Sequence, residues 1–131
     1  MPVNEVEIEL PDSPTAPAIA RRALDGLALS EPPANDACLL TSELVSNAVL
    51  HTRPADRDGI HLRVVQEPSN LRVEVSDNGG GFDWDGPQTD ASVPGGLGLV
   101  LVEAIAKRWG IHTNGRTCVW FDLDIHEETA P

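Results

Sequence analysis

One polar stripe in the sequence has residue types and a spacing that could serve chemistry. Glu43, Asn47 and His51 recur every four residues in a stretch otherwise rich in Leu, Val and Ala. Side chains four residues apart lie on one face of a helix, and a carboxylate beside an amide in an apolar helix is costly unless something pairs with them. Asn and Glu offer the hard oxygen ligands that Mg²⁺ takes in proteins. The stripe therefore predicts either a metal-linked site or the solvated side of a half-exposed helix.

A glycine-rich segment directly after a predicted strand is the second candidate. It consists of Asp77-Asn78-Gly79-Gly80-Gly81. A carboxylate at a strand end can accept a hydrogen bond from a ligand amine, and glycines let a flat ring approach the backbone closely. The same segment is also typical of a simple turn, so alone it leaves both interpretations open.

The third candidate is Gly95-Gly96-Leu97-Gly98, which opens a predicted helix. Unpaired N–H groups and the positive end of the helix dipole bind phosphate at such a place. The segment is not a P-loop, since no Gly-Lys-Ser/Thr follows, and not a dinucleotide fingerprint, since Leu101 stands where the last glycine should be. It fits a phosphate site and also an ordinary loop that enters a helix.

The elements that position these groups follow from the hydrophobic periodicity. Strands are predicted at residues 3–10, 61–66, 71–76, 111–113 and 117–125, and helices at 16–29, from Asn35 or Asp36 to about His51, and at 97–109. Residues 83–94 are predicted to form a loop of about a dozen residues, a length that is usually functional. The order predicts an α+β fold, a two-layer sandwich in which helices cover one face of a mixed, mostly antiparallel sheet. We expect a single domain over residues 1–131, a frayed tail at 126–131, and Trp109 and Trp120 in the core.

The charge balance limits the classes of partner. Nine Lys and Arg stand against 21 Asp and Glu among the 131 residues, a net charge of −12. Nucleic-acid binders draw their affinity mainly from Lys and Arg that neutralise phosphates, so a free-standing nucleic-acid binder is excluded. ATP would also be repelled unless a local site overrides the global field.

The cysteines and the apolar stretches lead us to expect a soluble cytoplasmic protein. Cys38 and Cys118 are too few for a disulfide scaffold or a structural zinc site, and two reduced, buried thiols are expected. The N-terminus has no basic region followed by an apolar run, the pattern of a signal peptide. The longest apolar stretch, residues 97–102, is far too short to span a membrane.

Taken in order, these groups resemble the GHKL ATP-binding fold shared by gyrase, Hsp90-type chaperones and histidine kinases. The resemblance is to its small single-domain branch, the anti-sigma-factor serine kinases and related regulatory ATP-binding proteins. Four segments carry it: residues 43–51 (ELVSNAVLH) as the N-box, 77–82 (DNGGGF) as the Asp-x-Gly-x-Gly-Phe box, 96–99 (GLGL) as the second glycine box and 115–121 (GRTCVWF) as the closing strand. It covers about residues 14–124, which would be the core of the domain, and implies a Bergerat-type ATP-binding fold.

The resemblance also implies a role for each matching residue. Asn47 would ligate an Mg²⁺ ion that bridges the ATP phosphates, and Glu43 would be the general base that accepts a proton from the attacking serine hydroxyl or from water. Asp77 would bind the adenine amino group, with Thr117 nearby through water. The other nucleotide-binding residues would be Gly79, Gly81, Gly96, Leu97 and Gly98. Residues 83–94, with Trp84, would be the ATP lid, and His51 either belongs to the N-box or complements the dipole at the helix end.

The implied function is that of an ATP- and Mg²⁺-binding anti-sigma factor. It would capture a sigma factor, phosphorylate an anti-anti-sigma-type protein as a serine/threonine kinase, and form a homodimer. The alternative is a non-catalytic module that uses nucleotide, if at all, only as a structural ligand. Its motivation is that residues 83–94 contain Asp83, Asp85 and Asp90 but no Lys or Arg. Phosphoryl transfer needs its charge offset, so Mg²⁺ and backbone amides would do most of this, helped by Arg53 or Arg57.

Overall fold

The computed structural model describes residues 4–11, 13–27, 29–31, 33–51, 59–77, 98–113 and 117–125. These residues contain the helices α1 (Ala16–Asp25), α2 (Pro33–His51) and α3 (Gly98–Ile105) and the strands β1 (Asn4–Leu10), β2 (Ile60–Gln66), β3 (Asn70–Asp77), β4 (Arg108–Thr113) and β5 (Thr117–Asp124). In this part of the chain, no helix is both long enough and apolar enough to span a membrane.

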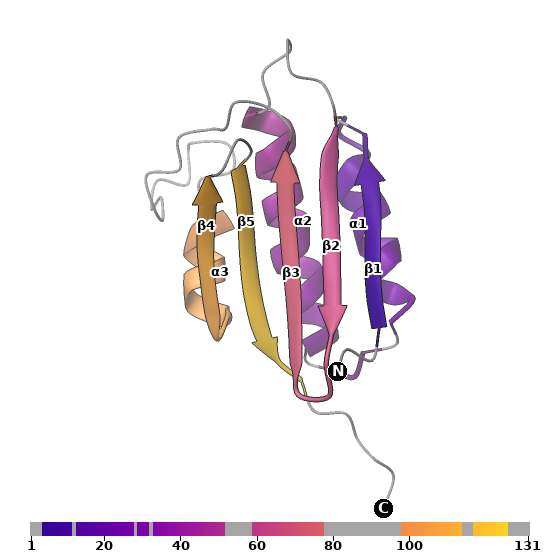
Figure 1. The fold of residues 1–131 in the computed structure, drawn as a ribbon, viewed down its shortest axis with the longest axis vertical. Helices are drawn as coiled ribbons and strands as arrows, with labels where there is room; N and C mark the ends of the chain where they lie inside the picture. The colour runs from indigo at the N-terminus through magenta and orange to yellow at the C-terminus, as the bar shows by residue number, and fades with distance from the viewer. Residues whose placement is uncertain are drawn as a thin grey trace, which may run out of the picture.

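The strands form one sheet in the order β1-β2-β3-β5-β4 (Figure 1). Every pair of neighbours is antiparallel, and β5 lies between β3 and β4. The strands β1 and β4 are therefore the two edges. The predicted α+β sandwich is confirmed, and the sheet is antiparallel throughout the described residues rather than mixed.

The three helices lie behind the sheet in Figure 1 and cover one of its faces. Side chains that face the helices alternate along the strands, as the period of two requires, and include Leu62, Val64, Val73, Val75, Val119 and Phe121, all buried. Helix α2 adds Leu40, Leu44, Val45 and Ala48 and contacts α1, α3 and the three central strands. The core is thus built around α2.

The end of the third helix differs most from the sequence prediction. The predicted helix runs to Trp109, but α3 ends at Ile105 and β4 begins at Arg108. Pairing with β5 explains the difference: Lys107 N–H donates to the Asp122 carbonyl oxygen at 2.8 Å, and Trp109 is paired with Phe121. A backbone group that is bonded across a sheet cannot also serve the i→i−4 ladder of a helix. The predicted strand at 111–113 is only the second half of β4.

The other two helices also have boundaries that differ from the prediction. Helix α1 ends at Asp25, and the N–H of its C-cap residue Gly26 donates to the Arg22 carbonyl oxygen at 3.3 Å. Helix α2 begins at Pro33, ahead of the predicted caps Asn35 and Asp36. Proline suits the first turn of a helix because the N–H that it lacks would have no helical partner there.

We call the sheet face that is turned away from the helices the open face. Its side chains come from alternate residues of all five strands and are mostly polar: Glu5, Glu7, Glu9, His61, Arg63, Val65, Asn70, Arg72, Glu74, Ser76, Arg108, His112, Cys118, Trp120, Asp122 and Asp124. The prediction that Trp120 is a core residue is therefore wrong. The Arg72 guanidinium lies 4.2 Å from the centre of the Trp120 ring. The His112 ring stacks on that ring, with 6.1 Å between the two ring centres. Trp109, in contrast, packs against the core.

The two cysteines, both described, form no disulfide, as predicted. Both are half-buried rather than buried. Burial raises the pKa of the Cys38 thiol, and the nearby Asp25 carboxylate raises it further. The Cys38 thiolate, which is the reactive form, is therefore disfavoured.

Candidate functional site

Helix α2 carries Glu43 and Asn47 one helical turn apart on one face. Glu43 is half-buried, and Asn47 is only 1% exposed, next to the core residues Leu44 and Ala48. The interpretation of the stripe as a solvated helix side is therefore wrong for Asn47. His51 is the last residue of α2, and its side chain lies outside the described part of the structure.

The Asn47 amide is buried without being satisfied. Within the residues that the structure describes, neither its Oδ1 nor its Nδ2 has a hydrogen-bond partner. Each such atom costs about 1–3 kcal/mol, and native structures contain few of them. An amide oxygen is a hard ligand of the kind that Mg²⁺ takes, and the amide N–H can donate to a phosphate or carboxylate oxygen. Asn47 therefore fits the chemistry of a metal and phosphate site.

The strands β3 and β5 bring the backbones of Asp77 and Thr117 together. Ser76 is paired with Cys118 in the antiparallel register, so Asp77, the last residue of β3, lies beside Thr117, the first residue of β5. Thr117 is buried, and the Asp77 side chain is outside the described part. The two residues that the resemblance assigns to adenine are thus neighbours, which their separation in the sequence alone does not show.

The elements of the candidate site meet at one end of the molecule. In Figure 1, the end of α2, the end of β3, the start of β5 and the start of α3 all lie toward the top of the sheet. Gly98 is the first residue of α3. The remaining predicted site residues, Gly79, Gly81, Gly96 and Leu97, lie outside the described residues, as do residues 83–94 with Trp84, and Arg53 and Arg57. The structure thus brings together the ends of the segments that carry the four motifs.

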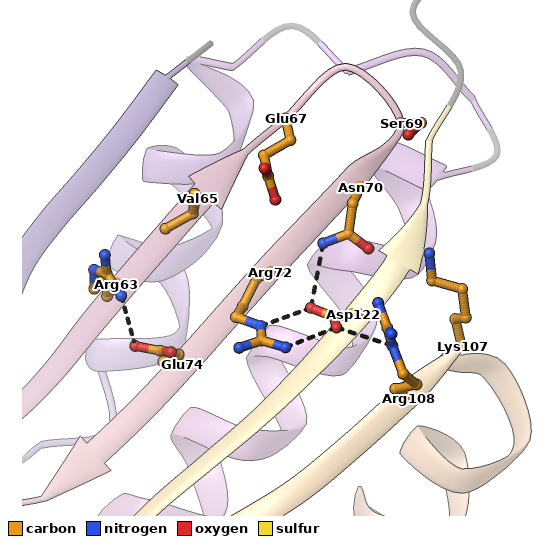
Figure 2. Close-up of a pocket in the computed structure, with 10 residues that line it drawn as sticks. All are labelled: Arg63, Val65, Glu67, Ser69, Asn70, Arg72, Glu74, Lys107, Arg108 and Asp122. Atoms are coloured by element: carbon orange, nitrogen blue, oxygen red, sulfur yellow. Dashed lines mark hydrogen bonds and ion pairs between the residues drawn. The ribbon is translucent and has the colours of Figure 1, made fainter. Parts of the chain in front are cut away.

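A second polar cluster, on the open face, was not predicted from the sequence. The Asp122 carboxylate is fully buried and accepts hydrogen bonds from Arg72 Nε at 2.8 Å, Arg72 Nη2 at 2.9 Å and Asn70 Nδ2 at 3.3 Å, and it lies 3.3 Å from Arg108 Nε (Figure 2). Burial alone would raise the pKa of Asp122, but these hydrogen bonds and the positive charges of Arg72 and Arg108 hold it below the ordinary value. The hydrogen bond to Asp122 raises the pKa of Arg72 in turn. The only signal in the sequence was the parity of the strand positions, which puts these residues on one face.

Comparison with known proteins identifies a family. The family model of the histidine kinase-like ATPase domain matches residues 9–123. The serine-protein kinase RsbW of Bacillus subtilis (strain 168) is 32% identical over 116 residues, which cover 76% of this chain and 72% of the relative. The serine-protein kinase RsbW of Listeria monocytogenes serovar 1/2a is 29% identical over 118 residues, which cover 78% of this chain and 75% of the relative.

A solved structure shows the same fold. It contains the RsbU and RsbW domains of a Mycobacterium tuberculosis protein and matches with a TM-score of 0.72 at 24% sequence identity. The match covers 95% of this chain but only 32% of that longer one. With the family match, the curated relatives and the four motifs in order, the chain belongs to the histidine kinase-like ATPase family, in the branch of the serine-protein kinases RsbW.

Proposed function

We propose that this protein is an anti-sigma factor that binds Mg·ATP and acts as a serine/threonine kinase. The observation that carries the proposal is the buried Asn47 amide, which lacks a hydrogen-bond partner among the described residues and lies one turn from Glu43. The ATPase family supports ATP as the nucleotide, and the relatives named serine-protein kinases support serine as the acceptor.

In this proposal each site residue binds, orients or accepts a proton. Asn47 holds the Mg²⁺ ion, which offsets phosphate charge when bound. Asp77 accepts a hydrogen bond from the adenine amino group, with Thr117 nearby through water. The glycine boxes admit the nucleotide and donate N–H groups to its phosphates through Gly79, Gly81, Gly96, Leu97 and Gly98. Glu43 accepts the proton of the serine hydroxyl as the serine oxygen bonds to the terminal phosphorus and ADP leaves.

The partners follow from the same branch of the family. They are a sigma factor, which the protein captures, and an anti-anti-sigma-type protein, which it phosphorylates. A net charge of −12 favours a basic partner, as a nucleic-acid-binding sigma factor would be. A homodimer, a single domain over residues 1–131 and a cytoplasmic location belong to the same proposal.

Titration calorimetry with Mg·ATP tests the nucleotide site. Wild type should bind, and Asp77→Asn should bind at least about tenfold more weakly, because a carboxylate acceptor is replaced by an amide that can turn a donor toward the adenine amino group. Glu74→Gln is the matched control, since it makes the same change on the same strand but on the open face. A folded wild-type protein that does not bind Mg·ATP would refute the site.

Phosphoryl transfer needs a separate experiment. Incubation with radiolabelled ATP and a panel of candidate antagonist domains should label a serine in one of them. Glu43→Gln should abolish the label and keep Mg·ATP binding, whereas Asp36→Asn, in the first turn of the same helix, should keep both. If Mg·ATP binds but no domain of a broad panel is labelled, the non-catalytic alternative holds, which the acidic segment 83–94 motivates.

A further inference from the structure

The open face carries two rows of alternating charge that run from strand to strand. In the first, Arg63 on β2 lies opposite Glu7 on β1 and Glu74 on β3 in the register, and it forms ion pairs with Glu5 and Glu74. In the second, Asp122 on β5 is paired with Arg72 on β3 and Arg108 on β4. The buried Asp122 carboxylate forms ion pairs with two guanidinium groups. The second row therefore has one more positive than negative charge.

Residues of both rows line a depression of about 570 Å³ in the open face, which we call the open-face depression (Figure 2). Its lining includes four cationic residues (Arg63, Arg72, Lys107 and Arg108), three acidic ones (Glu67, Glu74 and Asp122), and Val65, Ser69 and Asn70. The lining charge is 4 − 3 = +1, whereas the whole chain has −12. Four of the nine Lys and Arg residues are therefore gathered at one place on a strongly acidic protein.

The cations of the depression differ in how firmly they are held. Arg72 lies between the Asp122 carboxylate and the Trp120 ring, so it is oriented before any ligand arrives. Arg108 reaches Asp122 only through Nε, and its side chain is 63% exposed. Lys107 pairs with Asp124, an exposed carboxylate at 2.9 Å, and such pairs contribute only about 0–1 kcal/mol. Lys107 and Arg108 can therefore exchange or extend their contacts at little cost.

We propose that the open-face depression is a docking site for a carboxylate-rich segment of a partner protein. Attraction to Lys107 and Arg108 supplies the contact, and the net charge of −12 disfavours nonspecific binding of the same segment. This site goes beyond the proposed kinase activity. It lies on the sheet face opposite the helix that carries Glu43 and Asn47, so the segment and Mg·ATP can bind together.

The hydrogen-bonding groups of the wall favour a polypeptide over a simple anion. Asn70 Nδ2 donates to Asp122, which orients the amide, and Asn70 Oδ1 is a buried acceptor with no partner among the described residues. A peptide brings N–H donors next to its carboxylates and can satisfy such an acceptor. A nucleic acid needs many phosphates neutralised, and here Glu67, Glu74 and Asp122 stand between the cations.

Fluorescence anisotropy with a labelled hexaglutamate peptide and the full chain tests the proposal. Wild type should bind, and Lys107→Glu with Arg108→Glu should weaken binding by about tenfold or more. The matched control is Arg21→Glu with Arg22→Glu on the exposed side of α1, which should stay within about twofold of wild type. Both double variants change the net charge from −12 to −12 − 4 = −16, so only the place of the change differs. Both should bind Mg·ATP as wild type does.

Several results would overturn the docking site. One is that wild type does not bind hexaglutamate. Another is that both double variants weaken the binding equally, which would indicate repulsion by the whole molecule. Displacement of hexaglutamate by inorganic phosphate at equal concentration would indicate a site for a free anion. A change of sedimentation mass in the Lys107/Arg108 variant, with no effect of hexaglutamate, would indicate an interface between copies. If charge reversal unfolds the chain, Lys107→Gln with Arg108→Gln should still weaken binding about threefold.

Discussion

At the scale of single residues, Asp122 holds the open face together. Its pKa lies below the ordinary value because its hydrogen bonds and the two arginines outweigh the effect of burial. Such a carboxylate contributes stability that is present above the unfolded-state pKa of about 3.9 and is lost as the pH falls through the lower folded-state pKa. The free energy of unfolding of wild type should therefore fall below about pH 4, and Asp122→Asn, which cannot titrate, should show a smaller fall.

At neutral pH the same substitution should lower the free energy of unfolding by about 1–3 kcal/mol. The lower part of this range is expected, because Arg72 and Arg108 remain partly solvated when they lose their partner. Asp124→Asn is the control, since Asp124 is 65% exposed in a single pair with Lys107, and its effect should stay below about 1 kcal/mol. Urea unfolding at neutral and acid pH measures both effects. If the free energy of unfolding falls as steeply at acid pH in Asp122→Asn as in wild type, carboxylates other than Asp122 cause the fall.

At Gly110, the close approach of the Trp120 side chain requires glycine. A Cβ atom there would lie 2.8 Å from Trp120 Nε1 and 3.0 Å from two further ring atoms. The ring cannot simply turn away, because Arg72 and His112 pack against it. Gly110→Ala should therefore lower the free energy of unfolding by about 1–3 kcal/mol. Gly26→Ala, where the nearest atom would be 3.5 Å away, should be neutral or slightly stabilising in the same urea titration; equal losses would point to backbone effects instead.

At the scale of elements, α2 is a core helix that also carries the proposed ligand site, and the two demands conflict. Leu has nearly the shape of Asn but no polar atoms. Asn47→Leu should therefore leave the free energy of unfolding unchanged or raise it by up to about 1–2 kcal/mol, and it should abolish Mg·ATP binding. Thr41→Val is the control on the same helix, because Thr41 Oγ1 is also buried without a partner among the described residues. It should stabilise the protein and leave Mg·ATP binding unchanged. Thermal unfolding measures the effect of each substitution on stability, and calorimetry measures its effect on Mg·ATP binding. A strong loss of stability in Asn47→Leu would mean that the Asn47 amide has hydrogen-bond partners in the ligand-free protein.

The elements also show what the sequence could predict. The strand β3 has a period of two in its sequence, β2 keeps it up to Val64, and the polar stripe of α2 stands out against apolar neighbours, so the sequence predicts all three elements. The end of α3 differs from the prediction because the sequence of residues 97–109 suits a helix or a strand at its end, and the pairing of Trp109 with Phe121 decides between them. The position of Trp120 differs from the prediction because strand parity, and not side-chain size, decides it: Thr117, Val119 and Phe121 face the core, which turns Trp120 outward. Arg72 and Asp122 are 50 residues apart, so only the register joins them.

At the scale of the whole molecule, the excess negative charge is unevenly placed. The described Lys and Arg residues lie on α1 and on the open face, and the latter group lines one depression. The net charge of −12 would thus attract a basic partner, whereas among the described residues the cations that an acidic segment would meet lie in the open-face depression and at Arg21 and Arg22. Two partners of opposite charge could then use one small protein without competing.

The net charge of −12 leads to a prediction in which two electrostatic effects oppose each other. Added salt screens the mutual repulsion of the acidic groups, which stabilises the folded chain. It also screens exposed pairs such as Arg63–Glu5 and Lys107–Asp124, but each contributes only about 0–1 kcal/mol, so the repulsion should dominate. The thermal midpoint should rise by about 3–8 °C between low salt and about 0.3 M sodium chloride. The rise should be larger in both variants with a charge of −16, and the affinity for a basic partner should fall over the same range. A midpoint that falls with salt would show instead that the paired rows of the open face, rather than the net charge, govern the stability.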